Sequence, residues 1–118
     1  MICFLGAVES ADVCVQVADF HLRIINVFHV IVAGFVKDRL VIIFRGDGYR
    51  QDCGSIAIKS FGNIGTAGGH RSAARVEIPM ETLEAALEND LSQESVDRFL
   101  VQHLRRKKTA APNVNGRI

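Results

Sequence analysis

The chain has 118 residues, of which 48% are apolar, and this length and composition are typical of one compact domain. The formal net charge of +1 excludes a strongly basic nucleic-acid coat protein, because the average charge attracts no polyanion at long range. Any phosphate binding must therefore come from a local site.

The first residues, Met1 to Ala7, are apolar and predict either a strand or the stub of a linker. Ser10 is placed to cap a helix that continues to about Arg23, with one apolar face made by Val13, Val17, Phe20 and Ile24. The valines of this stretch also alternate, which favours a strand. We prefer the helix.

Val27 to Val36 is rich in β-branched and aromatic residues and is apolar at both alternating sets of positions, which predicts a strand covered on both faces. Lys37-Asp38 is a polar break, and Leu40 to Phe44 is a second strand. The two strands are expected to form a hairpin. Gly46 to Tyr49 has the composition of a turn.

Asp52 can cap a short helix that ends at about Phe61. The next segment, Gly62 to His70, contains four glycines in eight positions and is predicted to be a loop. Ala73 to Ile78 alternates small or apolar residues with charged ones, which indicates a strand with one face in water.

Pro79 starts a helix in which Met80, Leu83 and Leu87 share a side. A last helix begins near Ser92 or Gln93, ends in the basic run Arg105 to Lys108, and has a buried stripe of Val96, Phe99, Leu100 and Leu104.

These elements predict a single α+β domain at residues 1–108, followed by a loose tail at residues 109–118. The expected domain has a mixed sheet with a hairpin packed by helices. It also has a glycine-rich Gly-Gly-His loop between a helix and a strand.

The cysteines Cys3, Cys14 and Cys53 lie far apart, without the spacing of a zinc site, so we expect free thiols in a reducing cytoplasm. The apolar stretch from Ile24 to Val36 is shorter than a membrane span. The apolar start of the chain lacks the basic flank of a signal peptide. We therefore predict a cytoplasmic protein with no membrane partner.

The segment Gly68-Gly69-His70 is the best candidate for a binding site. Glycines let successive backbone N–H groups point at one anion, and a histidine beside them adds a donor. Arg71, and Arg45 and Arg50 near the preceding turn, could supply forked donors to phosphate oxygens. The alternative is that the glycines only make a tight connection.

A longer pattern is carried by Phe44-Arg45-Gly46-Asp47-Gly48, Asp52, Ile56-Ala57, Phe61-Gly62, Gly68-Gly69-His70 and Ala73-Ala74. In this order they resemble the DHH-associated domain of the first type, the C-terminal substrate-binding module of DHH-family phosphoesterases. Thr66-Ala67, Gly46 and Arg75 stand where many members of that family have other residues.

The resemblance implies that Arg45, Gly68, Gly69, His70 and Arg71 bind the phosphate of a nucleotide or of short single-stranded nucleic acid. It also implies that a DHH catalytic domain in the parent protein holds manganese and hydrolyses the phosphoester. This chain has no Asp-His-His motif, so we expect no metal site and no catalytic residue in it.

The other polar candidates are given structural roles. Asp19 and His21 are interpreted as surface residues, and His29 and His103 as histidines that pack in the core. Cys53 follows a helix cap without a nearby base, so we do not predict a nucleophile.

The sequence thus predicts a phosphate-binding module that serves an absent metal-dependent enzyme. Two alternatives stay open: an RNA-binding appendage like that of some alanyl-tRNA synthetases, and a complete small phosphoesterase. A homodimer is a further option that the sequence leaves undecided.

Overall fold

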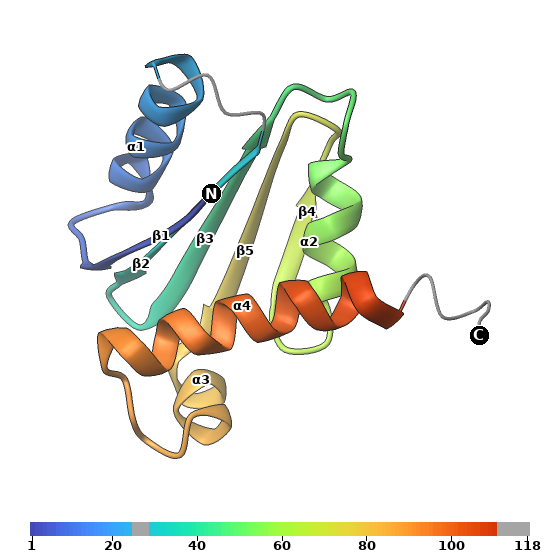
Figure 1. Cartoon of the computed structure of the whole chain (residues 1–118). Coiled ribbons are helices and arrows are strands. Elements are labelled where there is room, and N and C mark those ends of the chain that lie inside the picture. The colour runs from blue at the N-terminus through green and yellow to red at the C-terminus, as the bar shows by residue number, and fades with distance from the viewer. Residues whose placement is uncertain (25–28, 111–118) are drawn as a thin grey trace.

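The computed structural model describes the backbone of residues 1–24 and 29–110 and the side chains of residues 1–23 and 29–104. Within them, one mixed sheet has the strand order β1-β2-β3-β5-β4 (Figure 1). Its strands are β1 (Ile2–Ala7), β2 (His29–Val36), β3 (Arg39–Gly46), β4 (Thr66–Gly69) and β5 (Ala73–Pro79). β1 runs parallel to β2, and the other pairs are antiparallel.

Helices cover both faces of this sheet. They are α1 (Ala11–Ile24), α2 (Cys53–Phe61), α3 (Met80–Ala86) and α4 (Gln93–Ala110). α4 crosses one face beside α2 (Figure 1), while α1 packs over β2 and β3 on the opposite face. In the described part of the chain, no helix combines the length and the apolar character needed to cross a bilayer. The predicted α+β class with a mixed sheet is confirmed.

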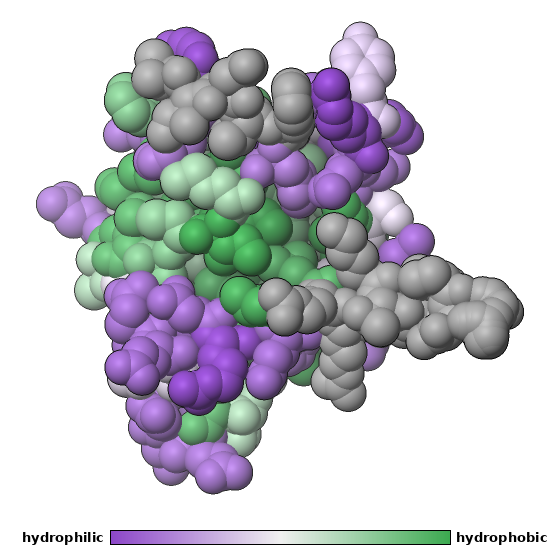
Figure 2. Space-filling model, in the orientation of Figure 1, coloured by the Kyte–Doolittle hydropathy of each residue, from purple (hydrophilic) through white to green (hydrophobic). Residues whose placement is uncertain are grey.

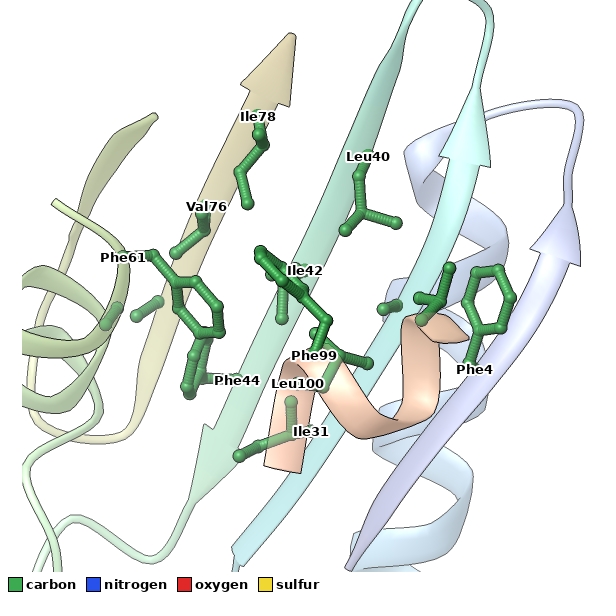
Figure 3. Close-up of a cluster of buried hydrophobic side chains, with 14 of the residues drawn as sticks. Phe4, Ile31, Leu40, Ile42, Phe44, Phe61, Val76, Ile78, Phe99 and Leu100 are labelled. Carbon is green, nitrogen blue, oxygen red and sulfur yellow. The ribbon is translucent and has the colours of Figure 1, made fainter. Parts of the chain in front are cut away.

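The central strand β3 shows why the sheet is covered twice. Leu40, Ile42 and Phe44 point toward α2 and α4, where they meet side chains such as Phe61 and Phe99 (Figure 3). Val41 and Ile43 point the other way, toward α1. An unbroken apolar run in one strand fills two cores, because successive side chains alternate between the faces.

The N-terminal predictions fit the structure. Ile2–Ala7 is a strand, and Ser10 precedes a helix as preferred. β2 and β3 form the predicted hairpin, with Lys37 in a left-handed conformation (φ 55°) in its turn. The first two residues of the predicted strand, 27 and 28, lie outside the described residues.

The start of α2 is also as predicted. A carboxylate oxygen of Asp52 accepts a hydrogen bond from the backbone N–H of Ser55 at 3.2 Å. This side-chain cap satisfies one of the donors that a helix leaves open at its beginning.

The prediction of a loop from Gly62 to His70 is wrong for its second half. Thr66–Gly69 forms β4, which pairs with β5. Glycines disfavour an isolated strand, but here β5 supplies the hydrogen-bonding partners and Ala67 packs against the core. This segment is a strand because it pairs with β5, and the number of glycines in it gave no sign of that pairing.

The C-terminal helices agree with the sequence pattern. Leu83 of α3 is buried, as are Val96, Phe99 and Leu100 of α4. The backbone of α4 continues to Ala110, two residues into the predicted tail. The rest of that tail, and the side chains of Arg105 to Lys108, lie outside the described residues.

Candidate functional site

The sheet brings two of the predicted site residues into one row. Arg45 of β3 is the register partner of Ala73 in β5, and the N–H of His70 donates to the carbonyl of Ala73 at 2.8 Å. Because neighbouring strands lie about 4.8 Å apart, the Cα atoms of Arg45 and His70 are separated by roughly 10 Å. A phosphodiester segment can bridge two side chains at this spacing.

Arg45 is held in place by α1. Its Nε atom is buried and lies 3.0 Å from Oδ1 of Asp19, an ion pair without the alignment of a hydrogen bond. Asp19, interpreted from the sequence as a surface residue, therefore also has a partner in the sheet. Asp19 positions Arg45, and the long separation in sequence hid this contact.

Gly69 has a packing role that the sequence did not reveal. Its φ is +150°, and a Cβ atom there would lie 2.4 Å from the carbonyl oxygen of Ala73. The backbone of Gly69 and His70 also lies close to Gly54 in the first turn of α2. A Cβ atom on Gly54 would lie 2.9 Å from the carbonyl oxygen of Gly69. Gly54 therefore lets α2 rest directly on the β4–β5 hairpin, and Gly69 lets β4 lie close against Ala73 and Ala74 of β5.

The backbone donors of this region are largely used within the chain. The N–H groups of Gly62, Ile64 and Gly65 donate to carbonyls of α2, and that of His70 donates to Ala73. The N–H groups of Cys53 and Gly54, which begin α2, donate to the carbonyls of Arg71 and His70 at 2.9 Å. An anion nest of converging N–H groups is therefore not supported, and side chains are the better donors.

Arg71 ties the β4–β5 connection to the turn that precedes α2. Its Nε donates to the carbonyl of Gly48 at 2.7 Å, and its Nη1 lies 3.6 Å from Oδ2 of Asp52. In the same turn Arg50 pairs with Asp47. Backbone N–H groups, first that of Tyr49, also donate to Asp47 and lower the pKa of its carboxyl group.

Next to α1, one face of β3, β5 and β4 carries mostly polar side chains. We call it the open sheet face and define it by Arg39, Arg45, Thr66, Gly68, Ala73, Arg75 and Glu77. Register and alternation put these residues on the same side as Val41 and Ile43. His70 continues this face at its end.

Glu77 links two arginines of the open sheet face. Its Oε1 accepts from Nη1 of Arg39 at 2.7 Å, and its Oε2 lies 2.9 Å from Nε of Arg75. The hydrogen bond from Arg39 is the main reason that the pKa of Glu77 lies below its ordinary value. Arg75 keeps half of its side chain exposed (50%), so its guanidinium can still reach a ligand.

Gly68 lies on the open sheet face without any neighbour. A Cβ atom at this position would meet nothing within 4 Å, in contrast to the crowded Gly69. A ligand can therefore approach the backbone of β4 at Gly68, and a side chain can be added there without disturbing the fold.

His103 and two of the cysteines have packing roles. The ring of His103 stacks on Phe61 with centroids 5.4 Å apart, and its Nδ1 lies 3.1 Å from the carbonyl oxygen of Phe99. Cys14 and Cys53 are fully buried, and burial raises the pKa of both thiols. Among the described residues, no three His, Cys, Asp or Glu side chains converge in a way that could hold a metal ion.

The comparisons with known proteins identify one relative in sequence. The chain is 28% identical over 97 residues to an uncharacterized protein of Methanocaldococcus jannaschii. The match covers 82% of this chain but 20% of that protein, so the chain spans about a fifth of the length of the curated relative it matches. No family model matches the chain.

A solved structure shares the fold. The C-Ala domain of alanyl-tRNA synthetase from Aquifex aeolicus superimposes with a TM-score of 0.55 over 75% of this chain and 88% of that domain, at 12% sequence identity. This likeness is one of fold alone.

These findings correct the resemblance to the DHH-associated domain. No family model matches the chain, and the structural neighbour is a synthetase domain and no part of a phosphoesterase. The assignments that depended on the resemblance, a DHH partner domain and a hydrolase parent, are withdrawn. The resemblance failed because it rested on short glycine and alanine patterns, which recur wherever a helix packs closely on a strand.

Proposed function

We propose that this domain binds RNA, and that the open sheet face with His70 and Arg71 contacts the phosphates. The observation that carries the proposal is the gathering of arginines from two strands, Arg39, Arg45 and Arg75, on one sheet face. They pair with Asp38, Asp19 and Glu77, and Arg75 keeps half of its side chain exposed.

The geometry suits phosphate better than a base edge. Guanidinium groups offer forked donors to phosphate oxygens, and phosphate contacts position a nucleic acid without reading its sequence. The carboxylates pair with the arginines and restrict their side chains, which lowers the entropy cost of binding a ligand. With a net charge of only +1, local contacts rather than a long-range field must supply the affinity.

The fold neighbour supports RNA over other polyanions. That domain is part of an alanyl-tRNA synthetase, an enzyme that acts on tRNA. Structured RNA, rather than a mononucleotide, is the ligand we propose. The size of the curated relative supports an appendage role, because this domain corresponds to a fifth of a longer chain.

Fluorescence anisotropy with a labelled tRNA transcript tests this proposal. Arg75→Ala should weaken binding by about tenfold, because a charge-assisted hydrogen bond contributes roughly 1.5–3 kcal/mol. The matched control is Arg98→Ala, which removes an exposed arginine from α4 on the other side of the sheet. Its affinity should be unchanged.

His70→Ala and Arg45→Ala should each weaken binding, and their effects should be less than additive if both side chains contact one phosphate segment. A duplex DNA of equal length and AMP serve as competitors. Equal losses for Arg98→Ala and Arg75→Ala would contradict a site on the open sheet face. Competition by AMP as effective as that by tRNA would contradict recognition of structured RNA.

A further inference from the structure

A cleft of about 580 Å³ opens on the opposite face of the sheet, between the beginnings of β1 and β2 and the helices α2 and α4. Its strand side is formed by Ile2, His29 and Ile31. Figure 2 shows the surface around it as an apolar area above α4, bordered by hydrophilic side chains. No part of the phosphate-binding surface proposed above lies in this cleft.

One face of α2 forms the other wall. Ser55, Ile56, Lys59 and Ser60 recur at the spacing of one helical turn and all line the cleft. Ile56 and Leu104 of α4 extend the apolar floor, while Ser55 and Lys59 place a hydroxyl and an ammonium group above it. Lys59 is exposed and forms no ion pair with any described carboxylate.

We propose that this cleft holds one unstacked nucleobase of a bound RNA, an inference that rests on the proposed function. A base needs flat apolar contact on its faces and mixed donors and acceptors at its edge. Ile31 with the imidazole ring of His29 supplies the first. The hydroxyl of Ser55 and the side-chain amide of Gln51, which also lines the cleft, supply the second. Lys59 contacts the attached phosphate.

The size and the position of the cleft both fit this ligand. Its volume lies in the range of pockets that enclose small molecules, roughly 300–1,000 Å³. Asp52 lines the cleft on one side and pairs with Arg71 on the other, at 3.6 Å. A single strand can therefore cross this end of the sheet with its phosphates at Arg71 and one base turned into the cleft.

The test uses the whole chain and two tryptophan variants of α2. Ser55→Trp fills the cleft, whereas Ile58→Trp adds the same side chain at an exposed position (53%) outside it. Ser55→Trp should weaken the binding of a single-stranded RNA trinucleotide at least tenfold, and Ile58→Trp should leave it unchanged. Lys59→Glu, an exposed substitution that does not threaten folding, should also weaken it.

Amide chemical shifts locate the ligand directly. The protein is titrated separately with AMP, UMP and inorganic phosphate. Either nucleotide should shift the amide resonances of Ile31, Ser55 and Ile56. Equal shifts with phosphate alone would overturn the assignment of a base. If tRNA binding depends on Arg75 while Ser55→Trp and Lys59→Glu bind as wild type, the cleft assignment is wrong and the proposed function stands. If the nucleotides move the cleft amides but no variant of the open sheet face affects tRNA binding, the cleft stands and the proposed function fails.

Discussion

Gly68 and Gly69 are adjacent in sequence, but the space around their Cα atoms differs. Gly68 faces open space, whereas a side chain at Gly69 would meet the backbone of Ala73 and Ala74. The sequence suggested that both are ligand-binding glycines. The crowding at Gly69 means that a side chain there would disturb the fold itself.

Gly69→Ala should lower the free energy of unfolding by at least about 2 kcal/mol, because it adds both backbone strain and overpacking. Gly68→Ala should change it by less than about 1 kcal/mol, and in the stabilising direction if its backbone suits alanine. Urea unfolding followed by circular dichroism measures both. Equal stability of the two variants would contradict the close contact of Gly69 with Ala73 and Ala74.

At the scale of elements, the beginning of α2 is a junction. Asp52 caps the helix through Ser55 and pairs with Arg71, while the first two N–H groups of α2 donate to the connection between β4 and β5. The cap therefore fixes both the helix and the part of the chain that carries His70. Stability and binding should be coupled here.

Asp52→Ala should lower the free energy of unfolding by about 1 kcal/mol through loss of the cap. Asp52→Asn keeps a capping side chain and removes the charge, so it should lie within about 0.5 kcal/mol of the wild type, since exposed ion pairs contribute little. Thermal unfolding of the two variants separates these effects. An equal loss of about 1 kcal/mol or more in both variants would show that the pair with Arg71, and not the cap, stabilises the junction.

The two edge strands of the sheet are β1 and β4. β4 is only four residues long and half glycine, and its outer edge lies beside α2. Short edge strands resist pairing with other chains. The homodimer option stays a prediction.

At the scale of the whole molecule, the charge distribution limits how RNA can be bound. The proposed site offers a few cations on a nearly neutral domain, and each neutralised phosphate contributes roughly 0.7 to 0.9 to the salt slope. The logarithm of the affinity should therefore fall with the logarithm of the salt concentration with a slope of about −2 to −3.

Arg75→Ala should make this slope shallower by about 1, and Arg98→Ala should leave it unchanged. Anisotropy titrations between low and physiological salt provide the measurement. A slope steeper than about −5 in the wild type, retained in Arg75→Ala, would place the main contacts elsewhere on the chain.

Most of the elements could be predicted from local pattern. Neighbouring residues were enough to predict the hairpin of β2 and β3, the cap at Asp52 and the buried stripe of α4. Turns, caps and periodic apolar faces depend on residues only a few positions apart. β4 could not be predicted, because its stability comes from β5 and not from its own glycine-rich residues.

The site divides in the same way. The sequence pointed to Arg45, His70 and Arg71 as donors, because their residue types indicate phosphate chemistry, and their role stays a prediction. The sequence analysis did not include Arg39 and Arg75 among the candidate donors. Side chains alternate along a strand, so their positions in β3 and β5 put them on the same face of the sheet. The sequence also missed Asp19 as the partner of Arg45 because nothing local links a helix to a strand end so far along the chain.

By itself, then, the sequence determined an α+β domain, its helices, most of its strands and the kinds of donor it can offer. Only the tertiary structure decided that Gly69 belongs to the packing while Gly68 faces outward, that the backbone donors are used within the chain, and that a cleft opens beside α2. The reason is physical: periodicity and capping are local, whereas the partner of a buried group or an edge strand is set by residues that folding brings from elsewhere.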